Sequence, residues 1–436
     1  MGFSNAAATV SRRWAVVTFI FLGILVSYVD RGNLGIAAPA IMREFGFSPG
    51  AMGVLLSAFF WTYATFQIPA GALVDRFGIR RSYAAAFLLW SIASAAIGLS
   101  RSRGEIVLFR MMLGMAEAVG PIASLSFIRR NFENAGGGLP TSIYIAGQNL
   151  GPAAGALLGT ELIEHFGWRA MFIFTGLGAL LWLPGWLLTV PRNERASVNE
   201  PKAVASGERQ RIPWGAALAT RGFWASSACI FLSSYFWYFL LTWVPTYLIS
   251  SRGLSNLEMG HVLSTALFAM AFVNIAAGFI ADRASRRAAG TDSGLRVRVW
   301  FCAAGYLGSG ALLLLLVLPQ REAVLPVLLF SVCATGIGNS NYWTISQQIA
   351  PPGIVGRAIG YFNTISQIAG AAAPLITGWL LGPEKAFSLA LGIAGVAPIL
   401  AAVCLLYAGA KGLEQTRRSL GDYESYKAYS GDSRAS

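Results

Sequence analysis

Long apolar runs alternate with short polar segments along almost the whole chain. A helix that spans a membrane needs about 20 mostly apolar residues. Runs of that length between charged, Pro or Gly breaks predict twelve spans, at residues 14–36, 52–74, 82–99, 105–128, 140–162, 169–190, 222–248, 258–281, 297–318, 323–347, 356–380 and 385–408. The pattern therefore predicts an all-α membrane protein.

The spans fall into two sets of six. A polar linker rich in Arg, Glu and Ser, residues 191–221, separates the sets. The expected organisation is a first bundle at 1–190, the linker, a second bundle at 222–411 and a tail at 412–436. The tail is predicted to be disordered because its polar composition offers no apolar face to bury.

Lys and Arg are concentrated in the segments that would lie on the same side as the N-terminus. Cytoplasmic loops of membrane proteins carry this excess. Both termini are therefore predicted to lie inside, with Arg12 and Arg13 holding the N-terminus there. The expected location is the inner (plasma) membrane of a bacterium.

Composition supports a lipid environment, since only 12% of the 436 residues are charged and 55% are hydrophobic. Soluble domains have about 25% charged residues. The net charge of +13 comes from short basic clusters between apolar runs, which does not indicate a nucleic-acid partner. Four single, widely spaced cysteines and two histidines predict neither a disulfide framework nor a metal site.

Two loop segments repeat, each after an even-numbered span: GALVDRFGIRR at 71–81 and GFIADRASRR at 278–287. At one constant offset, the matched residues are Gly71, Asp75, Arg76 and Arg80 with Gly278, Asp282, Arg283 and Arg287. At a second offset they are Gln148, Gly151 and Gly159 with Gln367, Gly370 and Gly378. Two halves related by duplication are typical of secondary transporters.

The repeated loops have two interpretations. Ion pairs between their aspartates and arginines could hold one conformation closed and break when the halves rock. Alternatively, the arginines only anchor the loops inside. The fixed offset favours the gating role, for which the candidates are Asp75, Arg76, Arg80, Asp282 and Arg283.

The motif GxxxDRxGxRR, its weaker copy and the two sets of six spans resemble the major facilitator superfamily over nearly the whole chain. Within it, YVDR at 28–31, RMMLGMAEA at 110–118 and GQNLGP at 147–152 are similar to the anion:cation symporter family, which includes bacterial sugar-acid transporters and sialin. The resemblance implies the fold of that superfamily and an organic anion as the substrate.

Four charged residues interrupt the apolar runs: Asp30 and Arg31 in the first span, and Arg110 and Glu117 in the fourth. Each costs roughly 2.5–3.5 kcal/mol near the bilayer centre, so such residues are functional candidates. Arg110 and Glu117 are two helical turns apart and share a face. Because the four charges sum to zero, two purely structural ion pairs are the alternative.

In the functional interpretation, an arginine binds the substrate carboxylate through its fork, and a carboxyl takes up the proton. A nearby arginine favours the ionised carboxyl, while burial disfavours it. A substrate that engages the arginine therefore promotes protonation of the acid, which is symport. The resemblance implies that Asp30 and Glu117 carry the protons. It further implies that Arg31 coordinates the anion or relays the coupling, and that Arg110 pairs with the acids. Arg31 and Arg110 are therefore the candidates for binding the substrate carboxylate and for coupling.

Other polar residues in the spans are candidates for binding the substrate body. In the first half these are Tyr28, Tyr63 and Gln148. In the second half they are Asn341, Trp343, Asn363 and Ser366, accompanied by Asn339, Tyr342, Ser346, Gln347, Thr364 and Gln367. Many hydroxyl-binding groups without a formal charge suit a polyhydroxy acid whose carboxylate points to the first half. Isolated Ser and Thr are alternatively helix–helix contacts.

Two patterns stay open. The aromatic run YFWYFLLTW at 235–243 could stack on a sugar ring or form an outer gate. The glycines at every fourth position of GQNLGPAAGALLG, residues 147–159, weakly favour exchange, but close helix packing alone is the favoured interpretation.

These features predict a proton-coupled secondary transporter that imports a small organic anion, a sugar acid such as a hexonate, hexuronate or aldarate, by alternating access. The proton gradient supplies the energy, so no cofactor is expected. The predicted partners are the anion, protons and the lipid bilayer, and the predicted state is a monomer. The alternatives are an exporter or antiporter of an anionic or aromatic compound, a transporter-like sensor, and a membrane enzyme. The enzyme is disfavoured because the chain has no HExxH, GxSxG or Walker motif.

Overall fold

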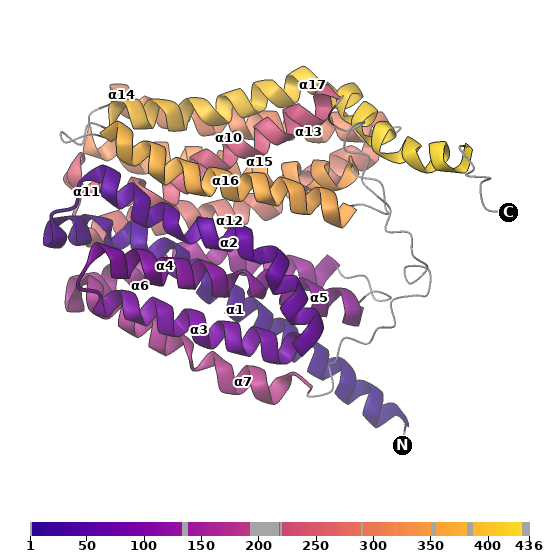
Figure 1. The fold of residues 1–436 in the computed structure, drawn as a ribbon. Coiled ribbons are helices and arrows are strands. Elements are labelled where there is room, and N and C mark those ends of the chain that lie inside the picture. Colours follow the sequence, from indigo (N-terminus) through magenta and orange to yellow (C-terminus); the bar gives the residue numbers. More distant parts are fainter. Residues whose placement is uncertain are drawn as a thin grey trace. The chain divides into compact units, whose positions relative to one another are not determined.

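The computed structural model describes residues 2–132, 138–191, 218, 220–288, 291–318, 320–349, 355–381 and 387–429. Nearly all of them are helical (Figure 1). The helices before the linker are α1 (Gly2–Phe45), α2 (Pro49–Phe77), α3 (Ile79–Leu99), α4 (Arg103–Glu117), α5 (Val119–Phe132), α6 (Gly138–Ala179) and α7 (Trp182–Thr189). Those after it are α10 (Arg221–Thr242), α11 (Val244–Ser250), α12 (Asn256–Arg287), α13 (Thr291–Ser309), η2 (Gly310–Leu313), α14 (Leu314–Val317), η3 (Arg321–Ala323), α15 (Val324–Gln348), α16 (Val355–Leu381) and α17 (Ser388–Tyr429).

Eleven helical stretches among the described residues are long and apolar enough to cross a membrane. One of them, Leu139–Thr189, contains two of the predicted spans, because Gly167 adopts φ 80° and breaks α6 into two helices. This left-handed backbone region is open to glycine without strain. The predicted architecture of twelve helices in two bundles is therefore confirmed. Most of the predicted linker, residues 192–217 and 219, lies outside the described residues.

Local sequence explains where several helices begin and end. Ser48 caps α2, since its hydroxyl accepts a hydrogen bond from the Ala51 amide, and Pro49 occupies the first turn. Ser102 caps α4 by accepting from the Glu105 amide (3.3 Å). Between α2 and α3, Gly78 adopts φ 80° and allows the sharp reversal of the chain.

Contacts between Cα atoms divide the chain into two compact units. The first unit comprises the described residues of 1–198, 237–268 and 370–390, and the second those of 199–236, 269–369 and 391–436. Two segments of the predicted second bundle thus pack with the first bundle. This division differs from the predicted boundary between 1–190 and 222–411.

Glycines allow these segments to approach the first bundle closely. A Cβ atom added to Gly53 of α2 would lie 2.6 Å from the carbonyl oxygen of Pro374 in α16. A Cβ atom on Gly35 of α1 would likewise collide with the carbonyl oxygen of Leu241 in α10. Any larger residue would force these backbones apart, so glycine at both positions permits the contacts.

Helix α1 packs against α6 along the glycine stripe. A Cβ atom on Gly147 would lie 2.9 Å from the carbonyl oxygen of Phe21, and one on Gly151 would lie 2.5 Å from Cβ of Tyr28. The stripe is therefore a helix-packing surface. It fixes the part of α1 that carries the two charged residues.

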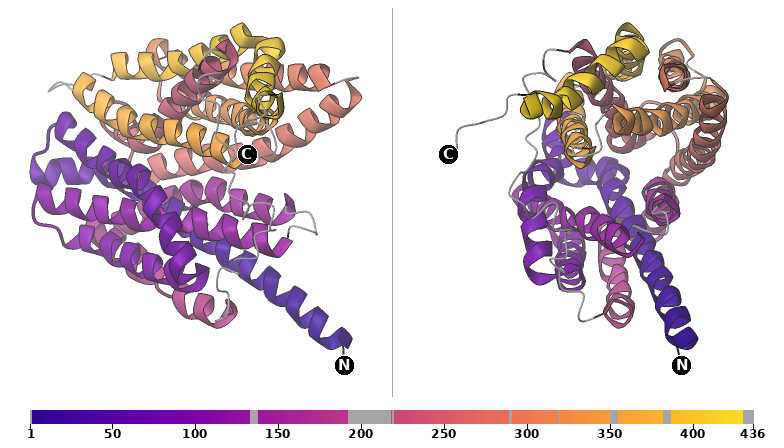
Figure 2. Two further views of the ribbon diagram at one scale, coloured as in Figure 1. Left: turned by 45° about the vertical axis from the view of Figure 1, so that its right-hand side comes forward. Right: turned by 90° about the vertical axis from the view of Figure 1, so that its right-hand side faces the viewer.

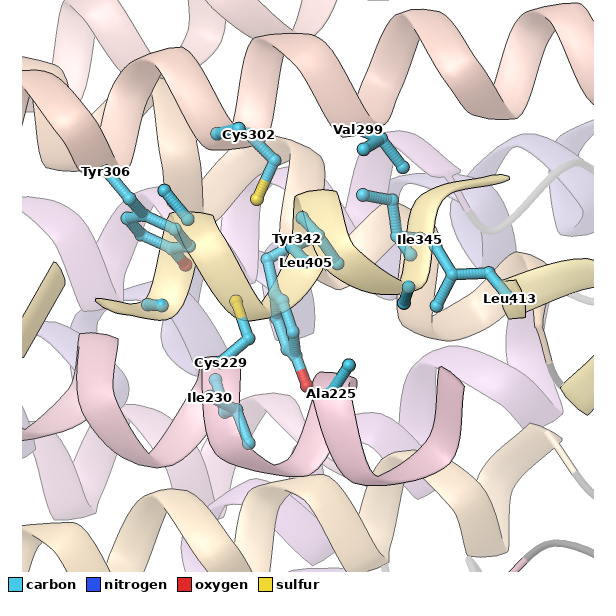
Figure 3. Close-up of a cluster of buried hydrophobic side chains, with 14 of the residues drawn as sticks. Ala225, Cys229, Ile230, Val299, Cys302, Tyr306, Tyr342, Ile345, Leu405 and Leu413 are labelled. Atoms are coloured by element: carbon cyan, nitrogen blue, oxygen red, sulfur yellow. The ribbon is translucent and has the colours of Figure 1, made fainter. Parts of the chain in front are cut away.

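The second unit has its own apolar core, shown in Figure 3. Cys229 of α10, Cys302 of α13 and Tyr342 of α15 are fully buried in it. The Tyr342 hydroxyl donates a hydrogen bond to the carbonyl oxygen of Ser226 (2.9 Å). Tyr342, one of the polar residues of the tenth span, thus has a structural role in this core.

The C-terminal part of α17 turns away from its first part (Figure 2, yellow). The break occurs at Gly409, which adopts φ 58°, and the helix then continues to Tyr429. Leu413 is buried, and the hydroxyls of Thr416 and Thr220 lie 2.9 Å apart. This ordered segment differs from the disordered tail predicted from residue 412, because one face of the segment finds a packing partner.

Candidate transport site

The four charged residues of the spans are all buried in the first unit. The exposed fractions are 1% for Asp30, 7% for Arg31, 2% for Arg110 and 0% for Glu117. Asp30 and Arg31 lie in α1, and Arg110 and Glu117 lie in α4. Such burial removes the charges from both water and lipid headgroups, so their energies depend on the partners that each finds inside the bundle.

Glu117 is held by α1 through two contacts to one carboxylate oxygen. Its Oε2 accepts hydrogen bonds from Nε of Arg31 (2.9 Å) and from the hydroxyl of Ser27 (2.7 Å). Ser27 and Arg31 are four residues apart, so both project from one face of α1. The other oxygen, Oε1, is buried and accepts no hydrogen bond from the described residues.

Asp30 has different partners from its neighbour Arg31. Its Oδ1 accepts hydrogen bonds from the hydroxyl of Ser94 in α3 (3.0 Å) and from Nδ2 of Asn33 (3.2 Å). Its Oδ2 is buried without a hydrogen-bond partner among the described residues. Consecutive side chains point about 100° apart around a helix, which is why Asp30 and Arg31 reach different neighbours.

Arg110 forms no ion pair with the described acids, although Asp30 and Glu117 act on it electrostatically; its pairing with these acids stays a prediction. Its Nε and Nη1 are buried and make no hydrogen bond to the described residues. Its Cζ lies 5.1 Å from the ring centroid of Phe59 in α2. Gly114 allows this approach, because a Cβ there would collide with the Phe59 carbonyl oxygen. Contact with an aromatic face provides part of the stabilisation that an ion pair would give.

Arg31 is surrounded by aromatic rings from two helices. Its Cζ lies 4.5 Å from the ring centroid of Tyr28, 4.4 Å from that of Tyr63 and 5.1 Å from that of Phe59. The same Phe59 ring therefore contacts both buried arginines. The Nε of Arg31 donates to Glu117. Its two terminal nitrogens make no hydrogen bond to the described residues and are the donors left for a ligand.

Gln148 joins the aromatic side of this site. Its Nε2 donates to the hydroxyls of Tyr28 and Tyr144, both at 3.1 Å. The first-half candidates Tyr28, Tyr63 and Gln148 thus lie with Arg31 in one cluster. Polar groups around a buried cation are the arrangement expected where an anion with hydroxyl groups binds.

Two of the second-half candidates have hydrogen-bond partners within the second unit. Nδ2 of Asn341 donates to the carbonyl oxygen of Ile337 (3.0 Å) and to the hydroxyl of Ser340 (3.3 Å), while its Oδ1 is buried without a partner among the described residues. The hydroxyl of Ser366 lies 2.8 Å from that of Ser234. Their predicted contact with substrate stays a prediction.

The remaining second-half candidates lie in the same unit. Gln367 donates to Oδ1 of Asn363 (3.4 Å), within α16. Trp343 is partly buried against the apolar core. The hydroxyl of Ser346 donates to the carbonyl oxygen of Tyr342 (3.0 Å), a bond that satisfies it within α15.

The first loop motif makes contacts inside the first unit. Asp75 lies 3.8 Å from Arg130 in the last turn of α5, and its side chain is 75% exposed. Arg80 donates to the carbonyl oxygen of Leu187 near the end of α7 (2.8 Å), and Arg76 is exposed. An exposed ion pair of this length contributes little stability, so the helix-end contact of Arg80 is the stronger of the two.

The second loop motif contains a better-buried pair. Asp282 forms a close ion pair with Arg298 of α13, which is 6% exposed, and Arg283 is exposed. The helices of the second half therefore do carry a buried formal charge, contrary to the prediction. Arg298 lies in the second turn of α13, near the start of the predicted span at 297–318.

Part of the aromatic run 235–243 packs within the first unit. The rings of Tyr238 and Phe60 lie 4.7 Å apart and meet edge to face. A Cβ atom on Gly370 would lie 2.7 Å from Phe60 and 2.9 Å from Tyr238. Nε1 of Trp243 donates to the carbonyl oxygen of Pro374 (3.0 Å). These residues are packed against protein groups, and both roles of the run, a gate and stacking on a sugar, stay predictions.

Sequence reasoning missed several residues of the charged cluster. Ser27 and Asn33 lie one turn from Arg31 and Asp30 on α1, so helical spacing could have found them. Ser94 comes from another helix and Phe59 is apolar. No sequence signal connects either of them with the charges.

A profile of the major facilitator superfamily matches residues 20–374, well over half of the chain. The chain belongs to the major facilitator superfamily. The prediction of a transporter rather than an enzyme is thereby confirmed.

Two relatives are sugar-acid transporters by name. The hexuronate transporter of Bacillus subtilis (strain 168) is 27% identical, with 90% of this chain and 93% of the relative covered. A probable galactarate/D-glucarate transporter of Escherichia coli (strain K12) is 28% identical, with 92% and 95% covered. The crystal structure of a bacterial homologue of the human lysosomal transporter Spinster matches the fold with a TM-score of 0.71 at 18% identity, covering 94% of this chain and 98% of that one. The predicted resemblance to the anion:cation symporters is consistent with these relatives.

Proposed function

We propose that this superfamily member imports a sugar acid, such as a hexonate, hexuronate or aldarate, together with protons. The relatives named for hexuronate and galactarate/glucarate transport support this substrate class. The transporter works as a monomer in the inner membrane with both termini inside, and the proton gradient is its energy source.

The observation that carries the proposal is the buried contact between Arg31 and Glu117 at 2.9 Å. Glu117 occupies one edge of the guanidinium, and the terminal nitrogens make no hydrogen bond to the described residues. A substrate carboxylate fits these nitrogens as a bidentate partner. It then competes with Glu117 for the single positive charge of Arg31.

This competition couples the anion to a proton. Once the substrate shares Arg31, the positive charge no longer fully compensates the ionised carboxylate of Glu117. A buried charge without a full partner costs free energy, and protonation of Glu117 removes this cost. Protonation of Glu117 in turn leaves Arg31 fully available to the substrate. Because coupling between two ligands is reciprocal, each promotes the binding of the other.

Asp30 is the second proton carrier in this proposal. It is buried and has hydroxyl and amide donors instead of an arginine. Its proton uptake therefore depends less directly on substrate than that of Glu117. Tyr28, Tyr63 and Gln148 bind the hydroxyl groups of the sugar acid, since they supply donors and acceptors beside Arg31.

The test is uptake of a panel of labelled sugar acids into proteoliposomes, with and without an inward proton gradient. We expect one acid to accumulate only with the gradient, and Asp30→Asn to abolish accumulation while exchange of labelled for unlabelled substrate continues. Equal accumulation with and without the gradient contradicts proton coupling. Gradient-driven accumulation by Asp30→Asn at the wild-type level contradicts it as well. Exchange without any net uptake in the wild type identifies an antiporter instead.

A further inference from the structure

We propose that Ser94 and Asn33 are positioning residues for Asp30, and that they set the pH range over which the transporter takes up its proton. This inference rests on the proposed role of Asp30 in proton coupling. Neither residue belongs to the motifs from which a function was predicted.

The two donors bind the same oxygen of Asp30. The hydroxyl of Ser94 donates to Oδ1 at 3.0 Å and Nδ2 of Asn33 donates to it at 3.2 Å. All three side chains are at most 1% exposed. Oδ2, which makes no hydrogen bond to the described residues, is therefore the oxygen that receives the proton. Both bonds to Oδ1 can persist when Oδ2 is protonated, so the side chain keeps its orientation in both states.

The donors come from different directions and fix Asp30 to the bundle. Ser94 belongs to α3, and Asn33 belongs to α1. Nδ2 of Asn33 also lies 3.2 Å from the hydroxyl of Thr175 in α6. Asp30 is thus held at the meeting point of three helices, which keeps Oδ2 in one place.

The charged groups acting on Asp30 are Glu117 and Arg110 of α4, with Arg31 next to it on α1. The contacts from α3 and α6 are uncharged hydroxyls, those of Ser94 and Thr175. Neutral donors therefore make the direct contacts to the carboxylate. Donors to an ionised carboxylate stabilise that form and delay protonation to lower pH, so removing one should allow proton uptake at higher pH.

The experiment compares Ser94→Ala with Ser91→Ala in the full-length transporter. Ser91 lies one turn earlier on α3 and is also fully buried, but its hydroxyl has no hydrogen-bond partner among the described residues. The readout is the pH dependence of gradient-driven uptake in proteoliposomes. We expect Ser94→Ala to move the midpoint upward by about one pH unit, as for the loss of one hydrogen bond to a charged group, with the KM at saturating proton concentration unchanged.

Ser91→Ala should leave the midpoint in place, and Ser94→Thr, which keeps the hydroxyl, should restore the wild-type profile. Asn33→Ala should shift the midpoint in the same direction and carries the test if Ser94→Ala does not fold. Equal profiles for Ser94→Ala and Ser91→Ala, with Asn33→Ala also unshifted, overturn the inference. A wild type without any proton dependence overturns the proposed function instead, so the two failures are distinguishable.

Discussion

Replacing Glu117 by glutamine isolates the coupling step. The change preserves the shape of the side chain but removes its charge and its capacity to take up a proton. In the wild type, a substrate carboxylate competes with Oε2 of Glu117, which lies 2.9 Å from Nε of Arg31. In Glu117→Gln the competitor is a neutral amide oxygen.

The size of the effect follows from this exchange of partners. A hydrogen bond to a charged group contributes about 1.5–3 kcal/mol, and one between neutral groups about 0.5–1.5 kcal/mol. A competing contact that is weaker by about 1.4 kcal/mol corresponds to roughly tenfold tighter anion binding. The gain should appear at a pH at which wild-type Glu117 is ionised and should vanish at a pH at which it is protonated.

The assay is calorimetric titration of the purified transporter with its sugar acid at mildly acidic and mildly alkaline pH. Wild-type affinity should fall as the pH rises, while that of Glu117→Gln should fall much less. Glu105→Gln, the same change three turns earlier on α4 and outside the cluster, is the matched control. Weaker binding by Glu117→Gln at alkaline pH, or a pH dependence equal to that of the wild type, would refute competition for Arg31.

Three further substitutions test other parts of the structure. Arg31→Lys should raise the KM for substrate by roughly tenfold or more, since an ammonium group lacks the bidentate fork; an unchanged KM in uptake assays would remove Arg31 from the substrate site. Gly151→Ala should lower the thermal unfolding midpoint in detergent, because its Cβ would lie 2.5 Å from Tyr28 and overpacking costs about 1–3 kcal/mol. Gly178→Ala on the same helix is the control, since the space around Gly178 is open and the midpoint should not change. Tyr342→Phe should cost about 1 kcal/mol of stability by removing the hydrogen bond from the tyrosine hydroxyl to the Ser226 carbonyl, and it should leave the KM unchanged if Tyr342 only supports the core.

The sequence by itself determined the helical architecture and the presence of a charged cluster. Lipid cannot hydrogen-bond to backbone groups, so apolar runs of spanning length have to be helices. Charges inside such runs are costly enough to mark a site before any packing is known. The glycine stripe could be assigned to helix packing for a similar reason, because its period matches one helix face.

Only the tertiary structure decided which partner each charge has. Adjacent positions of a helix face different neighbours, and the sequence pattern does not say which helix lies against each face. Asp30 therefore contacts Ser94 of α3, although Arg31 is next to it in the chain, and Arg110 lies against Phe59 without an ion pair.

The same limit applies to longer segments. Their polar or apolar composition is local, whereas burial depends on contacts with residues far away in the chain. The polarity of the tail from residue 412 predicts disorder, yet Leu413 is buried and the hydroxyl of Thr416 lies 2.9 Å from that of Thr220. In the same way, Pro374 of the second half packs on Gly53 of the first, because a missing side chain at that glycine lets two backbones meet.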